Sequence, residues 1–177
     1  MGGFSVSTHS YVKLAMEAVH YYLLKGELLP CPSPLPPGME CRSGVFVSIK
    51  IKKNRNLRGC IGTIEPNQDN LAQEIIKNAV SAATRDPRFE PITIEELDTF
   101  SFSVDTLTPL EPINTPDKLN PQRYGLSIKG SSKQGILLPD LEGIDTPEKQ
   151  IDICLKKAAI PKNSHYQMYR FEIKRYK

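Results

Sequence analysis

Residues 45–64 read VFVSIKIKKNRNLRGCIGTI and decide the fold expected for the surrounding chain. Two apolar runs, Val45–Ile51 and Leu57–Ile64, flank the polar and basic turn KKNRN. Short runs rich in β-branched residues on either side of such a turn are typical of a β-hairpin. We therefore predict two paired strands, with the glycine-containing LRGCIG motif of residues 57–62 in the second.

Helices are predicted on both sides of this hairpin. Apolar residues recur at helical spacing near Ser10–Lys25 and again near Asp69–Thr84. The second helix is expected to end before Pro87, because proline removes a backbone donor and clashes with the preceding turn. A third helix is predicted to begin at Thr146, whose hydroxyl caps it, and to run to about Ala159.

Further strands are predicted where apolar and polar residues alternate, namely at Phe100–Val104, in a second hairpin of Gly125–Lys129 and Gly135–Leu138, and in a closing strand through Tyr169–Ile173. The segment Thr108–Pro121 carries four prolines and is predicted to be a long loop. The proline-rich residues 30–44 are predicted to cross the surface as a connector. Because strands outnumber helices and join by hairpins, we expect one α+β domain over residues 1–177, with a mainly antiparallel sheet flanked by helices in a larger part and a small subdomain.

The composition is that of an ordinary globular protein. Hydrophobic residues make up 39% of the 177 residues, and 23 basic against 20 acidic side chains give a net charge of +3. Such a weak field does not by itself indicate a nucleic-acid or membrane partner. No run approaches the ~18 apolar residues of a membrane span, and the N-terminal MGGFSVSTHS lacks the basic and apolar regions of a secretory signal. We expect a cytoplasmic protein that makes no membrane contact.

The sequence gives no ground to expect a metal or a cofactor. Its four cysteines form no C-x-x-C pair, and its three histidines lie in no metal-binding pattern. The phosphate-loop pattern and the dinucleotide glycine fingerprint are both missing. The cysteines are therefore interpreted as free thiols.

The LRGCIG motif places a cation and a thiol in one strand. Because side chains two positions apart share a strand face, we expect Arg58 and Cys60 to point one way, while Leu57 and Ile61 point into the core. A guanidinium beside a thiol lowers the pKa of the thiol and favours the nucleophilic thiolate. This pair is the first candidate site.

The flanking glycines admit two interpretations. Gly59 and Gly62 offer no side-chain cover, so a ligand has room to approach the backbone beside Cys60. Glycine also permits a bulge, and a bulge would reset the alternation of side chains. Alternatively, Cys60 is a small buried hydrophobic residue and the glycines mark tight packing.

Polar side chains after the second predicted helix form a weaker set of candidates. Asp86, Arg88 and Glu90 follow this helix, where the bend at Pro87 allows them to turn toward the sheet. Asp86 or Glu90 is then placed to handle protons. The simpler interpretation is that Asp86 and Arg88 pair with each other or cap the end of the helix, as surface ion pairs often do.

The segment LRGCIGTIEP at residues 57–66 resembles the signature of the AMMECR-domain family, named after Alport syndrome, midface hypoplasia and elliptocytosis. The resemblance continues through AATRDPRFEP at 82–91, SVDTLTPLEPI at 103–113 and GILLPDL at 135–141. It implies an α+β fold with a larger part and a smaller subdomain, and it implies no settled biochemical activity. Ala159 stands where glycine is common in the family.

The resemblance also carries expectations about the site and the partners. It implies that the functional centre includes Arg58, Gly59, Cys60 and Gly62. Members resemble protein A of the AmmeMemoRadiSam system, so the implied partners are Memo-like proteins and radical S-adenosylmethionine proteins.

The preferred hypothesis is a binding or accessory module that presents the LRGCIG face to a small anion or to such a partner protein. In this hypothesis Arg58 and Arg88 grip a carboxylate or phosphate through paired hydrogen bonds, and the glycine backbone lets the ligand come close. The alternative is a thiol-dependent enzyme in which Cys60 attacks an electrophile, Arg58 stabilises the developing charge, and Asp86 or Glu90 moves protons.

Nucleic-acid binding through the first hairpin is a third hypothesis, and it is disfavoured. Five cations cluster in nine residues around the turn: Lys50, Lys52, Lys53, Arg55 and Arg58. No aromatic residue interrupts the cluster to stack on bases, and runs of charge are usually solvated turns.

Overall fold

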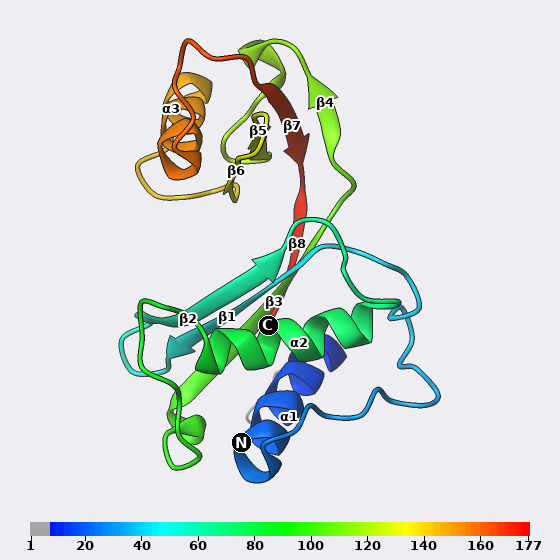
Figure 1. Cartoon of the computed structure of the whole chain (residues 1–177). Helices are drawn as coiled ribbons and strands as arrows, with labels where there is room; N and C mark the ends of the chain where they lie inside the picture. Colours follow the sequence, from blue (N-terminus) through cyan, green and yellow to red (C-terminus); the bar gives the residue numbers. More distant parts are fainter. Residues whose placement is uncertain (1–7) are drawn as a thin grey trace, which may run out of the picture. The chain divides into compact units, whose positions relative to one another are not determined.

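The computed structural model describes residues 8–177 and places them in three α-helices and eight strands, which form two sheets (Figure 1). Each sheet is antiparallel and has four strands, so the predicted α+β fold is confirmed. Residues 1–7, on which most of the expectation about a secretory signal rests, lie outside the described residues. The chain forms two compact units, one reaching to Thr106 and including Lys174–Lys177, the other spanning Leu107–Ile173.

The first unit is a sheet with two helices on one of its faces (Figure 1). Its strand order is β2-β1-β3-β8, with β1 at Val45–Ile51, β2 at Leu57–Thr63, β3 at Phe100–Leu107 and β8 at Ile173–Tyr176. Helix α2, Leu71–Thr84, packs against β1, β2 and helix α1, Ser10–Lys25. A short 3-10 helix, Leu97–Thr99, leads into β3.

Alternation along β1 decides which face of this sheet is buried. Val45, Val47 and Ile49 have no exposed surface and pack in one core with residues of both helices. The residues between them, among which are Ser48 and Lys50, are only half-buried and point to the opposite face. The sheet therefore has an apolar face under the helices and a polar face on the other side.

The second unit has its own sheet and its own core. Its strand order is β4-β7-β5-β6, with β4 at Glu111–Ile113, β5 at Gly125–Lys129, β6 at Gln134–Leu137 and β7 at Gln167–Phe171. Helix α3, Pro147–Ala158, packs on β5 and β6. A second 3-10 helix spans Pro116–Lys118. The core gathers Leu126, Ile128, Cys154 and Leu155.

Two sequence predictions need correction. The closing strand is two strands in different sheets, because Glu172 interrupts it and exchanges hydrogen bonds with Thr108 through its backbone N–H and C=O. The predicted loop Thr108–Pro121 contains β4, which tolerates Pro112 because it is the edge strand of its sheet. None of the helices in residues 8–177 has the length and the apolar composition that crossing a membrane requires.

Candidate functional site

The LRGCIG strand, β2, bulges at Arg58. In the β1–β2 ladder Ile49 lies opposite Gly59 and Lys50 lies opposite Leu57, so Arg58 is an extra residue without a partner across the ladder. The bulge resets the alternation of side chains. Leu57, which was expected to share the core face with Ile61, therefore lies opposite Lys50 on the polar side of the sheet.

The same bulge separates the Arg58 guanidinium from Cys60. Arg58 Nη2 lies 3.5 Å from the carbonyl oxygen of Pro91 and 3.9 Å from a carboxylate oxygen of Glu96, and its guanidinium carbon lies 5.7 Å from the centre of the Phe100 ring. Only 14% of the Arg58 side chain is exposed. The extra residue thus turns Arg58 toward the loop before β3, and no contact within residues 8–177 joins its guanidinium to the Cys60 thiol.

Asp86 and Arg88 cover the outer edge of β2, an arrangement that we call the edge clip. The Cys60 N–H donates to Asp86 Oδ2 at 2.9 Å, and Arg88 Nη2 lies 3.4 Å from the Cys60 carbonyl oxygen. Arg88 also donates to the Asp86 carboxylate through Nε at 2.9 Å and Nη2 at 2.7 Å. The clip thus supplies the hydrogen bonds that a further strand would supply, and the predicted Asp86–Arg88 pair is present.

The clip leaves little capacity for proton transfer. Hydrogen bonding from the Arg88 side chain, helped by the backbone N–H groups of Cys60 and Arg88, lowers the pKa of Asp86 to about 2 even though burial opposes the shift. Asp86 is therefore an engaged carboxylate at neutral pH. Glu90 is exposed to solvent.

The two motif glycines serve close packing. A Cβ on Gly59 would lie 2.1 Å from the carbonyl oxygen of Ala82 in α2, and a Cβ on Gly62 would lie 2.3 Å from the Phe46 ring. The space that the sequence offered to a ligand beside these residues is filled by the protein itself. The tight-packing interpretation of the glycines holds at both positions.

Cys60 belongs to a polar row across three strands. It lies opposite Ser48 of β1, which in turn lies opposite Ser103 of β3. The Ser48 hydroxyl donates to Cys60 Sγ at 3.3 Å. The thiol is free and half-buried.

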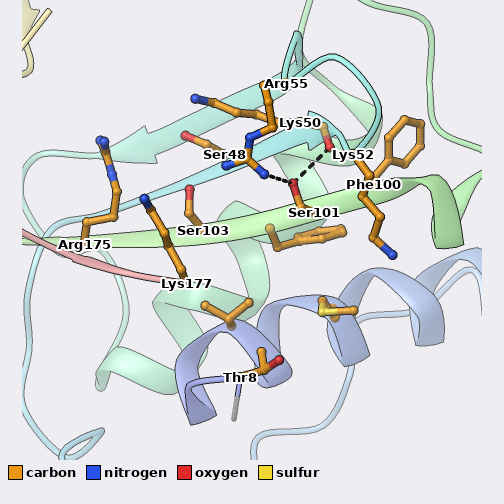
Figure 2. A pocket seen from close by; sticks show the side chains of 13 residues that line it. Thr8, Ser48, Lys50, Lys52, Arg55, Phe100, Ser101, Ser103, Arg175 and Lys177 are labelled. Carbon is orange, nitrogen blue, oxygen red and sulfur yellow. Dashed lines mark hydrogen bonds between the residues drawn. The ribbon is translucent and has the colours of Figure 1, made fainter. Parts of the chain in front are cut away.

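A cleft of about 360 Å³ opens beside this row and includes Ser48 in its wall (Figure 2). Five cationic side chains line it: Lys50, Lys52, Arg55, Arg175 and Lys177. Four hydroxyls line it as well: Thr8, Ser48, Ser101 and Ser103. Its described lining contains no aspartate or glutamate.

The five cations differ in how far they are engaged. Arg175 forms two hydrogen bonds of 2.8 Å with the buried carboxylate of Asp105, which offsets its charge. Lys52 Nζ donates to the Asp98 carbonyl oxygen at 2.7 Å, and Arg55 Nη1 lies 3.5 Å from the Ser101 hydroxyl. Within residues 8–177 no carboxylate pairs with Lys50, Lys52 or Arg55. The cleft therefore keeps an excess of positive charge.

The sequence indicated only part of this cleft. The basic turn residues Lys50, Lys52 and Arg55 were noticed, but as a sign of nucleic-acid binding. Arg175 and the serines of β3 were missed, because only the β1–β3 and β3–β8 pairings bring them to the turn. The available signal was the FSFSV alternation of residues 100–104, which puts the serines on the face opposite the phenylalanines.

These features define an α+β protein whose first sheet carries an LRGCIG strand with a clipped edge and a cationic cleft. The AMMECR1 family model matches residues 12–177, so the chain belongs to the AMMECR1 family and the predicted resemblance is confirmed.

Similar proteins match most of the length of this chain. A Thermotoga maritima protein is 41% identical, covering 97% of this chain and 99% of its own length. A Clostridium acetobutylicum protein is 44% identical over 94% of this chain, which corresponds to 36% of that longer protein. The crystal structure of the uncharacterized protein PH0010 from Pyrococcus horikoshii superposes with a TM-score of 0.85 at 31% identity, covering 93% of this chain and 88% of that one.

Proposed function

We propose that this protein is a binding module whose cleft holds an anionic group of a small ligand or of a partner protein. The observation that carries the proposal is the cleft lining, which has five cationic side chains, four hydroxyls and, among the described residues, no aspartate or glutamate. Ammonium, guanidinium and hydroxyl groups together donate the charge-assisted hydrogen bonds that a phosphate or carboxylate accepts. The Memo-like and radical S-adenosylmethionine proteins implied by the family resemblance are the partners to test first.

The anion site differs from the one expected from the sequence. Arg58 contacts the loop before β3, and Arg88 is hydrogen-bonded to Asp86, so the protein already engages both guanidinium groups in part. Lys50 and Arg55 take their place, and Ser48 connects their cleft to the thiol of Cys60.

The alternative, an enzyme with Cys60 as nucleophile, has less support. Its electrostatic partner Arg58 contacts Pro91 and Glu96, and its proton carrier Asp86 is ionised and bound in the clip. The hydrogen bond from Ser48 remains as the one polar side-chain contact of the thiol among the described residues.

Calorimetric titration with inorganic pyrophosphate and with citrate tests the proposal at low salt. We expect the wild type to bind at least one of these anions. The Lys50→Ala/Arg55→Ala double variant should bind at least about tenfold more weakly, since hydrogen bonds to charged groups contribute ~1.5–3 kcal/mol each.

The matched control is Lys77→Ala, because Lys77 is an exposed cation of α2 that does not line the cleft. It should bind as the wild type does. A folded wild type that binds neither anion, or a double variant that binds both as tightly as the wild type, contradicts the proposal.

A further inference from the structure

The cleft follows the edge of β3. Four consecutive residues of this strand line it, from Phe100 to Ser103. Neighbouring side chains of a strand point to opposite faces, so a space that touches four in a row must pass around the edge of the strand. Figure 2 shows Lys50 and Arg55 on one side of β3, and Thr8 with helix α1 on the other.

Strand β8 covers only part of this edge. The Thr108 N–H donates to the Glu172 carbonyl oxygen, and the Asp105 carboxylate binds Arg175. Both contacts fit one antiparallel register, and in this register Tyr176, the last residue of β8, lies opposite Val104. Phe100–Phe102 therefore extend beyond β8.

The backbone groups of Phe102 face the side that no strand within residues 8–177 covers. Cys60 turns both its N–H and its C=O to the edge clip, so the Ser48–Cys60 pair makes no ladder hydrogen bonds. The N–H and C=O of Ser48 therefore point to the other neighbouring strand, β3, where they pair with Ser103. Successive residues of a strand point these groups to opposite sides, so the N–H and C=O of Phe102 point away from β1. The hydrogen bond from the Lys52 N–H to the Thr99 carbonyl oxygen agrees with this pattern, because this pair lies an even number of residues along the ladder from the bonded Ser48–Ser103 pair.

No strand among the described residues pairs with Phe102 on this side, so its N–H and C=O are available to a strand from another chain. We infer that the anionic ligand of the cleft is an extended acidic segment of a protein chain, added as a short strand to the edge of β3 at Phe102. This inference rests on the proposed function, because it takes the cationic cleft as the binding site. Strand addition is a common mode of peptide recognition, in which main-chain hydrogen bonds give affinity and alternate side chains give specificity.

The two sides of the edge specify the side chains of the added segment. A residue opposite Phe102 points to the side of Val12 and Met16, and Met16 is 37% exposed, so an apolar side chain fits there. Its two neighbours point to the side of Lys50 and Arg55, where acidic side chains fit. Acidic and apolar side chains therefore alternate in the segment. Its length is about four residues at ~3.4 Å per residue, because the cleft follows the four residues Phe100–Ser103.

Backbone methylation separates strand addition from simple charge attraction. The probe is the peptide acetyl-Glu-Val-Glu-Val-Glu-amide, titrated beside inorganic pyrophosphate. In the inferred register the valine amides face β3 and the glutamate amides face away from it. Methylating the valine amide nitrogens should weaken binding at least about tenfold, while methylating those of the two inner glutamates should leave it within about twofold.

Each outcome bears on the inference. Equal binding of both methylated peptides and the parent, or equal loss in both, overturns strand addition. Binding of pyrophosphate without binding of the parent peptide overturns the inference and leaves the proposed function standing. If pyrophosphate, citrate and the parent peptide all fail to bind, both are overturned. Tighter binding of a thymidine oligonucleotide than of the peptide also overturns the inference.

The Lys50→Glu variant, with an unchanged circular dichroism spectrum, should no longer bind the parent peptide.

Discussion

Asp86 is a buried carboxylate whose four hydrogen bonds join a strand edge to the loop that follows α2. It accepts from the backbone N–H groups of Cys60 and Arg88 and from two guanidinium nitrogens of Arg88. All four donors favour the ionised form, which is why the pKa falls although the side chain is withdrawn from water. Its negative charge is thus part of what holds β2 in place.

This charge makes stability depend on acid pH. The pKa of Asp86 is about 2 in the fold against an ordinary value of 3.8, so the ionised group stabilises the protein above about pH 4 and loses that effect as the pH falls toward 2. The difference corresponds to about 2 kcal/mol. We expect Asp86→Asn to lower the free energy of unfolding in urea by about this amount at pH 7, and the gap to the wild type to narrow below pH 4. Glu90→Gln, at an exposed carboxyl nearby, should show no such trend, and a gap that stays constant to pH 2 would refute the assignment.

Ala159 adopts a strained backbone conformation at the end of α3. It ends α3 with φ +50°, a left-handed conformation that costs an alanine roughly 1 kcal/mol more than a glycine. Ala159→Gly should therefore raise the free energy of unfolding by about 1 kcal/mol. The neighbouring Ala158→Gly, at the last residue of the helix, should lower it by a similar amount. The two variants compared in urea denaturation decide the point.

At the scale of elements, β2 and α2 approach so closely that only a hydrogen atom fits between them at Gly59. A Cβ there would meet the Ala82 carbonyl oxygen, which belongs to helix backbone and cannot turn aside. We expect Gly59→Ala to lower the free energy of unfolding by about 3 kcal/mol, at the upper end of the cost of overpacking. Gly130→Ala is the control, because the atom nearest to its Cβ would be the flexible end of Ile160 at 3.2 Å, and the nearest backbone atom would lie at an ordinary contact distance of 3.7 Å. Equal effects of the two substitutions on thermal unfolding would contradict the packing argument.

Element positions followed well from sequence, because each helix has a local signal. The helix predicted at Ser10–Lys25 is observed at those residues, with Gly26 in the left-handed conformation at its end. The bulge at Arg58 did not follow, because it arises from the pairing of Lys50 with Leu57 across a turn, not from β2 alone. Without the bulge, the motif predicts a thiol site. In the structure its glycines allow close packing, Gly59 against α2 and Gly62 against Phe46.

The cleft was largely beyond prediction, because its charges come from distant parts of the chain. Lys50 and Arg175 are brought to one cleft only by the order of strands in the first sheet. Hydrophobic periodicity reports which face of a strand is buried, and it does not report which strand is the neighbour.

Across the whole molecule, the net charge of +3 gives no hint of so concentrated a positive cleft. Ligand capture should therefore depend on where a charge lies and not on the total. Lys50→Glu and Lys77→Glu both lower the net charge from +3 to +1, yet only Lys50→Glu should abolish pyrophosphate binding in a calorimetric titration. Wild-type affinity should also fall as salt rises from about 0.05 to 0.5 M, because exposed charges are screened. Equal losses in both variants would show that the overall field, and not the cleft, attracts the anion.

The edge clip has a consequence for how copies of this protein behave in a crowded cell. A sheet with two unpaired edge strands can pair with further copies at both edges, so that identical molecules stack into fibres. Here the margin formed by β2 is shut at Cys60 by a carboxylate and a guanidinium that mimic the absent neighbour. A strand added at β3, as inferred above, would therefore leave the first sheet without an open edge at Cys60 or Phe102 on which a second copy could stack.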